Sequence, residues 1–330
     1  MTMYGGNMFW RRGIPIASLV LAHVFMGISA GRAQTVGYAD AIDRLAVNCG
    51  KDIEKFCKKE PLGGGRIKQC LEGNQAAVAP SCKAAISQLT AMLQRRAAAR
   101  STIAQVCERD RLRLCNGIEA GDGNLMECFY KVKQNVSPAC RQAVADAGYE
   151  VALGSAGSPG AINLSGQDLV SSLQGVSDAP QTINAAQLRR LAAQSLKDPA
   201  RASRVDRPPL FEQLNSQAQI TIAIQFDFDS ARIRPDSFRA IGLMADALNH
   251  PYLQGYHFLI VGNTDAKGSR EYNLKLSQER ADAVRDALLN PFGIASARIE
   301  AVGLGEEQLL NRSNPDASEN RRVQLINIGK

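Results

Sequence analysis

The feature that most constrains this chain is a duplicated pattern of cysteines in its N-terminal half. All eight cysteines lie between residues 49 and 140, in two sets of four: Cys49, Cys57, Cys70 and Cys82, then Cys107, Cys115, Cys128 and Cys140. The intervals between successive cysteines are identical in the two sets, so the second set is the first moved by the constant offset that separates Cys49 from Cys107. Other positions obey the same offset, including Asp52 with Asp110 and Pro80 with Pro138. A fixed period of this kind indicates an internal structural repeat.

An even number of regularly spaced cysteines is typical of a disulfide framework in an exported protein. Zinc is disfavoured, because the region contains no C-x-x-C pair and no histidine; His250 and His257 lie far downstream. We therefore expect the eight cysteines to form disulfides, and the sequence predicts no bound metal or other cofactor.

Each repeat is predicted to be a helical hairpin. The stretch from Asp40 to Cys57 has apolar residues at helical spacing, the glycines at 63–65 break the helix, and a second helix passes through Cys70. Pro80 marks a further boundary. Two antiparallel helices would bring the outer cysteines together and the inner ones together, which predicts the pairs Cys49–Cys82, Cys57–Cys70, Cys107–Cys140 and Cys115–Cys128. Four cysteines allow three pairings in each repeat, so the sequence leaves the others open.

The N-terminus has the layout of a secretory signal. Arg11 and Arg12 precede an uncharged, mostly apolar run from residue 13 to 30, and the small residues Gly31 and Ala33 precede a cut before Gln34. Cleavage would remove residues 1–33 and leave a chain with a net charge of +4. The alternative is an uncleaved anchor helix, since an apolar run of about 18 residues is close to the shortest that spans a bilayer. Determining the mature N-terminus separates the two, because a start at Gln34 rules out the anchor.

The region 151–215 is interpreted as a partly ordered linker between residues 38–150 and residues 216–330. It begins with a glycine- and serine-rich break at 154–160. Residues 164–173 could form a short amphipathic helix, and residues 184–196 are predicted to form another, with an apolar stripe that includes Leu188 and Ala192. The alternative is that this second helix packs on a neighbouring domain.

Residues 216–330 have the pattern of a small α+β domain. Alternating apolar residues predict a strand over 219–228, and Pro235 opens a predicted helix that runs to residue 250. The remaining expected elements are a strand over 257–261, a helix over 274–289, and strands over 298–302 and 322–328. The order β-α-β-α-β-β predicts a two-layer sheet with helices on one side.

The same region carries a family signature. The stretches IQFDFDSARIRPDS, VGNTDAKGSREYNLKLSQERADAV, GLGE and NRRV, in that order, resemble the OmpA-like peptidoglycan-binding domain family. The cysteine repeats, over residues 45–142, resemble those of a Golgi cysteine-rich glycoprotein family that also occur in bacterial secreted proteins. That second resemblance implies a small helical fold and protein binding, although a stapled spacer is an equal alternative.

The first resemblance implies a binding site for diaminopimelate in the stem peptide of peptidoglycan. Diaminopimelate there ends in a free amine and a free carboxylate, so its site needs one acid and one guanidinium. The resemblance assigns the amine to Asp265 and the carboxylate to Arg280, and it implies a pocket lined by Asp227, Thr264, Asn273 and Arg321. Two departures from the family are Asn263, where a His is usual, and the loop 306–319, which lacks the usual proline after the Gly-x-Gly-Glu stretch.

We therefore expect non-covalent, non-enzymatic attachment to peptidoglycan in the periplasm, in association with the wall and the outer membrane. An enzyme is disfavoured because the chain shows no nucleophile elbow, zinc signature or Ser/Lys pattern. Nucleic acid is not an expected partner, since the positive charge is weak and evenly spread. Two alternatives stay open: an adaptor whose cysteine-rich module binds an envelope protein partner, and a signal-anchored stator-like protein.

Overall fold

The computed structural model describes residues 37–118, 123–149, 166–174, 183–197 and 213–330. The predicted signal segment, residues 1–33, and the glycine- and serine-rich break at 154–160 lie outside the described residues. None of the helices in the described ranges is both long enough and apolar enough to cross a membrane.

In the described part of the cysteine-rich module, six α-helices are held by four disulfides. The helices are α1 (Tyr38–Phe56), α2 (Arg66–Gly73), α3 (Pro80–Val106), α4 (Glu108–Leu114), α5 (Asn124–Lys131) and α6 (Pro138–Asp146). The disulfides join Cys49 to Cys82, Cys57 to Cys70, Cys107 to Cys140 and Cys115 to Cys128. These are the four predicted pairs. Corresponding pairs have similar Cα–Cα distances, 4.6 and 4.8 Å for the outer pairs and 5.9 and 6.1 Å for the inner pairs.

The prediction of a two-helix hairpin is wrong in one respect. Pro80 is a helix boundary, as predicted, but the boundary is the start of a third helix: Pro80 stands in the first turn of α3, where its missing N–H is not needed. The outer disulfide of the first repeat therefore joins α1 to a third helix rather than to α2. The 27-residue helix α3 is shared by both repeats, because it carries Cys82 near its start and is capped by Cys107 at its end.

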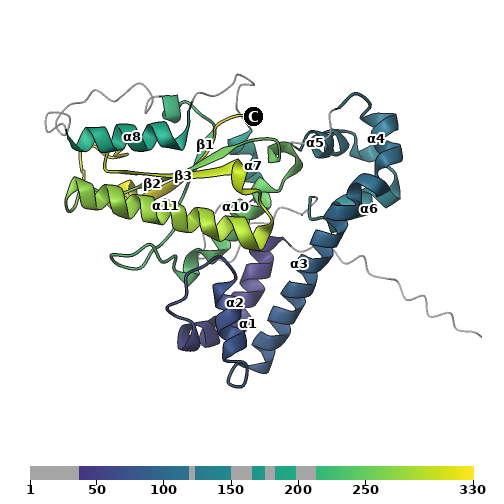
Figure 1. Cartoon of the computed structure of the whole chain (residues 1–330), viewed down its shortest axis with the longest axis horizontal. Helices are drawn as coiled ribbons and strands as arrows, with labels where there is room; N and C mark the ends of the chain where they lie inside the picture. The colour runs from purple at the N-terminus through teal and green to yellow at the C-terminus, as the bar shows by residue number, and fades with distance from the viewer. Residues whose placement is uncertain (1–36, 119–122, 150–165, 175–182, 198–212) are drawn as a thin grey trace, which may run out of the picture. The chain divides into compact units, whose positions relative to one another are not determined.

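The C-terminal region contains a mixed four-stranded sheet (Figure 1). Its strands are β1 (Gln219–Ile222), β2 (Phe258–Asn263), β3 (Ile299–Gly305) and β4 (Arg322–Asn327), in the spatial order β1-β4-β2-β3. Strand β4 is antiparallel to both β1 and β2, and β2 is parallel to β3. The predicted strand over 219–228 ends at residue 222, because the chain beyond it turns back and makes an isolated bridge between Phe226 and Ile233.

The two long helices of residues 216–330 lie on one face of this sheet, as predicted, and a helix from the predicted linker covers the other face. Helices α10 (Phe238–Leu248) and α11 (Arg270–Phe292) pack on one face, where Phe258 and Ile260 point. Helix α8 (Ala185–Leu196) packs on the other face, against Leu259 and Val261. Figure 1 shows α8 and α11 on opposite sides of the strands.

The predicted linker therefore contributes to the core. Leu188 and Ala192 of α8 are fully buried, as the alternative of a helix packed on a neighbouring domain requires. Helix α7 (Gly166–Leu173), also from this region, buries Leu169 and Leu173 in the cluster that contains α10. The apolar residues of both helices have the amphipathic spacing predicted from the sequence. In the structure these residues are buried in the two core clusters on either side of the sheet.

Two glycines let α11 approach the sheet closely. A Cβ atom on Gly303 would lie 2.1 Å from the backbone nitrogen of Gln278, and one on Gly262 would lie 2.3 Å from the backbone oxygen of Ser277. A hydrogen bond stabilises this contact: the Gly303 N–H donates to Gln278 Oε1 at 2.8 Å. The position of α11, which carries Arg280, is fixed by these backbone contacts.

The module also packs directly on the C-terminal region. The backbone N–H groups of Tyr38 and Ala39, at the start of α1, donate to the carboxylate of Asp246 on α10 at 2.8 and 3.0 Å. Gly242 on α10 allows this approach, since a Cβ atom there would lie 2.6 Å from the Cα of Ala39. The module and the C-terminal region are therefore joined by direct contacts as well as by the linker. Both belong to the one compact unit of residues 34–330.

Candidate functional site

The candidate site lies where strand β2 ends. Asp265 follows β2 and is 7% exposed. Its Oδ2 accepts a hydrogen bond from Arg321 Nη1 at 2.5 Å, and its Oδ1 accepts one from the Lys267 N–H at 3.3 Å. An ionised carboxylate has about four acceptor positions. These two bonds therefore leave Asp265 able to accept hydrogen bonds from a ligand amine.

Arg280 lies on α11 with its guanidinium 4.9 Å from the ring centroid of Phe226. Its Nε donates to the backbone oxygen of Ser230 at 3.0 Å. This is the one hydrogen bond that the guanidinium makes among the described residues, so its two terminal nitrogens have the geometry to hold a carboxylate by two parallel bonds.

Burial and the neighbouring charged groups of the site shift the pKa of Arg280. Burial lowers the pKa of Arg280, and the positive charge of Arg321 lowers it further. The Tyr272 hydroxyl and the carboxylates of Asp265 and Asp229 act in the opposite direction. The predicted acid and guanidinium thus influence each other, but the direct ion pair of Asp265 is with Arg321.

The other predicted residues are connected to this pair to different degrees. Asn273 is buried, and its Nδ2 donates to the Asp265 backbone oxygen at 3.2 Å and to Glu306 Oε2 at 2.6 Å. Thr264 is buried and its hydroxyl oxygen has no hydrogen-bond partner among the described residues. Asp227 makes an ion pair with Arg232, and its side chain is 33% exposed.

Asn263 and the loop 306–319, the two departures from the family pattern, are both held in place by hydrogen bonds. The Nδ2 of Asn263 donates to Gln324 Oε1 at 2.9 Å, across to β4. The loop 306–319 is ordered by buried Asn320, whose Nδ2 donates to the backbone oxygens of Asn311, Asn314 and Pro315. The Pro315 oxygen also accepts the N–H of Ala266, so the loop supports the turn that carries Asp265.

Sequence reasoning missed several residues that build the site. Glu306 and Ser230 are part of the quoted family stretches but received no role, although they bond to Asn273 and Arg280. Tyr272 donates its hydroxyl to Asp229, a non-glycine residue at φ 51°. Arg232 was also missed, since nothing in the sequence shows where its side chain goes.

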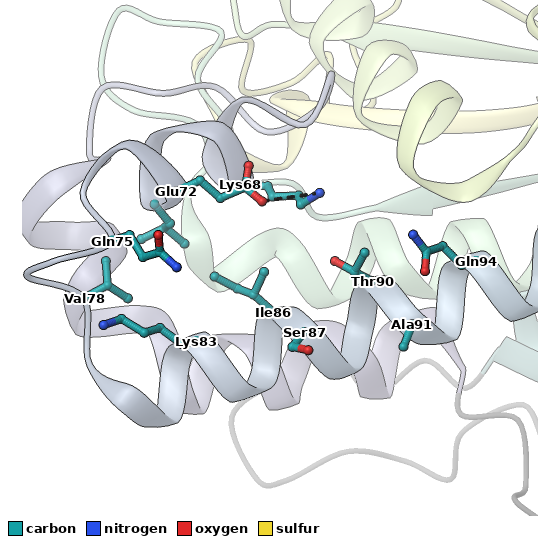
Figure 2. Close-up of a pocket in the computed structure, with 11 residues that line it drawn as sticks. Lys68, Glu72, Gln75, Val78, Lys83, Ile86, Ser87, Thr90, Ala91 and Gln94 are labelled. Carbon is teal, nitrogen blue, oxygen red and sulfur yellow. Dashed lines mark ion pairs between the residues drawn. The ribbon is translucent and has the colours of Figure 1, made fainter.

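A separate hollow lies on the first cysteine-rich repeat, between α2 and α3 (Figure 2). It has a volume of about 360 Å³ and an apolar floor that includes Leu71, Val78 and Ile86. Lys68 and Glu72, an ion pair at 3.5 Å, lie on its rim with Lys83. No group of three or more His, Cys, Asp or Glu side chains in the described ranges could hold a metal ion.

The fold and the site define a class: a small α+β domain with an acid and an arginine at the end of a central strand. Residues 225–322 match the OmpA family, so the C-terminal region carries an OmpA family domain. Residues 80–137 match the family described as a cysteine rich repeat. That match spans one full period of the duplication.

Curated relatives match about a third of this chain. The peptidoglycan-associated lipoprotein of Pseudomonas putida is 37% identical over 102 residues, which are 30% of this chain and 59% of the relative. Outer membrane porin F of Pseudomonas aeruginosa is 34% identical over 108 residues, 32% of this chain and 30% of the relative. The chain thus spans about a third to three fifths of the length of these relatives. The crystal structure of the peptidoglycan-associated lipoprotein from Burkholderia pseudomallei is 39% identical, with 32% of this chain and 87% of that chain covered and a TM-score of 0.28.

Proposed function

We propose that the C-terminal domain binds the stem peptide of peptidoglycan without catalysis and so anchors a periplasmic envelope protein to the wall. The observation that carries the proposal is the buried Asp265 carboxylate beside Arg280, whose two terminal nitrogens make no hydrogen bond among the described residues. The names of the relatives, a peptidoglycan-associated lipoprotein and an outer membrane porin, support the same location and wall partner.

The chemistry of the site favours diaminopimelate within that stem peptide. Asp265 would accept hydrogen bonds from the ligand amine, and Arg280 would take the ligand carboxylate through a bidentate pair. Lysine, which occupies the same position in some walls, has the amine but lacks the second carboxylate. A lysine-type stem peptide would therefore leave the Arg280 guanidinium partly buried without its ligand partner, and removing a partner from such a pair is costly.

Sedimentation with purified peptidoglycan tests this assignment. Asp265→Ala and Arg280→Ala are each expected to weaken binding to the diaminopimelate-type wall by about a hundredfold, because each leaves an unpaired charge on the ligand. Lys275→Ala is the matched control: its side chain lies on the same helix, is 79% exposed, and should bind like the wild type.

A comparison of wall types separates the two roles. The wild type should prefer diaminopimelate-type fragments over lysine-type fragments, and Arg280→Ala should abolish that preference while Asp265→Ala weakens binding to both. Equal sedimentation of the wild type and both variants would show that the site lies elsewhere.

The hollow on the first repeat favours a second, compatible function, an adaptor. Its apolar floor and the charged groups on its rim would suit an extended segment of an envelope protein with an apolar side chain and an acid facing Lys83. A photo-crosslinker placed at Ser87, which lines the hollow, should attach to one envelope protein in cells. The same group at the neighbouring exposed Gln88, outside the lining, should not. Equal crosslinking from both positions would argue against the adaptor.

A further inference from the structure

The loop 227–232 lies between the candidate site and the first cysteine-rich repeat. It is closed on itself, because the Asp227 N–H donates to the Arg232 backbone oxygen at 3.0 Å and Phe226 bridges to Ile233 just outside it. The Arg232 N–H also donates to the hydroxyl of Ser230 at 3.0 Å. A shift at one end of this short loop is therefore passed to the other.

One side of the loop contacts the site. The backbone oxygen of Ser230 accepts the Nε–H of Arg280 at 3.0 Å, and this bond orients the guanidinium. The carboxylate of Asp229 accepts the hydroxyl of Tyr272, one residue before Asn273 on α11. The loop thus sets the direction in which the terminal nitrogens of Arg280 point.

The other side of the loop contacts the cysteine-rich module. The Arg232 guanidinium bonds to two groups at once, since its Nε donates to the Asp227 carboxylate and its Nη1 donates to the backbone oxygen of Lys58. Lys58 directly follows Cys57, whose disulfide to Cys70 holds this stretch on α2. The Arg232 side chain is 21% exposed, and its bond to Asp227 is partly buried.

A second contact holds the same stretch of the module against α11. Gly63 has φ +108°, and a Cβ atom on it would lie 2.9 Å from the backbone oxygen of Asp286. Asp286 is six residues beyond Arg280 on α11. The neighbouring Leu62 packs against the core cluster that contains α10 and α11. The stretch 58–63 therefore contacts both the loop 227–232 and the helix that carries Arg280.

We propose that the first cysteine-rich repeat is a structural part of the binding site, and that Arg232 is the positioning residue that connects them. In this arrangement the module holds the loop 227–232, and the loop holds Arg280 in its binding orientation. Arginine is needed because its planar fork donates to two acceptors in different directions, which a lysine ammonium on a flexible stem does not reproduce. The inference rests on the proposed function and makes wall binding depend on the module.

Binding of the full-length chain to a soluble diaminopimelate-type muropeptide, measured by calorimetry, tests this role. Arg232→Met is expected to weaken binding about tenfold, the loss typical of a charged hydrogen bond in a partly buried setting. Arg232→Lys should recover little of it. Arg234→Met is the matched control, because that side chain is 52% exposed and pairs only with Asp236 among the described residues; it should bind within about twofold of the wild type.

A pair of glycine variants tests the module side without touching the site. Gly63 and Gly64 both have positive φ, so an alanine costs backbone strain at either. Only a Cβ on Gly63 would collide with α11, whereas the nearest atom to one on Gly64 is 3.9 Å away. Gly63→Ala should weaken muropeptide binding several-fold and Gly64→Ala should not.

The outcomes separate this inference from the proposed function. If the wild type fails to bind the muropeptide, the proposed function is wrong. If the wild type binds and both Arg232→Met and Gly63→Ala bind equally well, the positioning role is wrong. Equal weakening by Arg232→Met and Arg234→Met would also overturn it, since it would point to net charge rather than to the bridge.

Discussion

At the scale of single residues, one acid has the same structural role in both repeats. Asp52 and Asp110 occupy equivalent positions in the two repeats. The Asp52 carboxylate accepts the Ala79 N–H at 3.1 Å, at the N-terminus of α3. The Asp110 carboxylate accepts the N–H and the hydroxyl of Ser137, at the N-terminus of α6. In each repeat an acid on an earlier helix thus bonds to the residue that caps a later helix beginning with proline, where negative charge is favourable.

Removing these acids should destabilise the two repeats to different extents. Asp110→Ala is expected to lower the free energy of unfolding by about 1 to 2 kcal/mol, since its carboxylate's bonds to the capping residue Ser137 are lost and buried Asp110 also bonds to Arg113. Asp52→Ala should lower the free energy of unfolding by less, because only the hydrogen bond from the Ala79 N–H is lost. Asp146→Ala, at an exposed position in the last turn of α6, should change little. Urea unfolding with the disulfides intact measures all three, and a reversed order would contradict this role for the repeated acid.

The sequence could predict which residues of the candidate site lie near one another, but not how they pair. The resemblance names Asp265, Arg280 and Arg321, and the structure brings all three within electrostatic reach of one another. The ion pair between Asp265 and Arg321 depends on strand order, because β4 lies beside β2 with Asn263 opposite Arg322. Arg321 therefore lies across from the residues that follow β2. A single sequence gives strands but not which strands are neighbours.

At the scale of elements, apolar spacing predicted the helices better than it predicted their partners. The stripe with Leu188 and Ala192 identifies α8, but not that it covers the sheet. The sequence does hold one signal for that cover. The residues of β2, from Phe258 to Val261, form a continuous apolar run, which is typical of a strand buried on both faces. A one-sided sheet would favour alternation, as β1 shows.

At the scale of the whole molecule, close approaches at glycines join the module to the C-terminal domain. Gly242 lies against Ala39, and Gly63 lies against Asp286. A third, Gly123, lies where a Cβ atom would be 2.3 Å from Gln254. Near it, Tyr130 of α5 packs edge-on against His250 and Tyr252. A glycine in a sequence is usually interpreted as a turn or a helix end, so these contacts between distant segments could not be predicted.

The contact between α1 and α10 centres on one buried carboxylate, Asp246. Burial raises its pKa to about 6, while the N–H groups of Tyr38 and Ala39 and the charge of Arg96 act to lower it and Asp40 acts to raise it. Because the folded state binds this proton more tightly than the unfolded state, the contribution of Asp246 is fully favourable below pH 4 and is lost as the pH rises through 6. His250 acts in the opposite sense: burial lowers its pKa to about 4, so its contribution is lost as the pH falls through 4.

Comparison of the wild type with Asp246→Asn at each pH isolates the carboxylate, because the contribution of His250 is common to both and cancels. From pH 7 to pH 5, the free energy of unfolding of the wild type should rise by about 1 kcal/mol relative to that of the variant, following the raised pKa. The amide oxygen can still accept one N–H bond at the start of α1, so the variant should remain folded. Asp246→Ala, which accepts neither, should be the least stable of the three at both pH values. Chemical denaturation at pH 5, 6 and 7 measures these differences, and a pH-independent gap between the wild type and Asp246→Asn would mean that the Asp246 carboxylate does not titrate in this range.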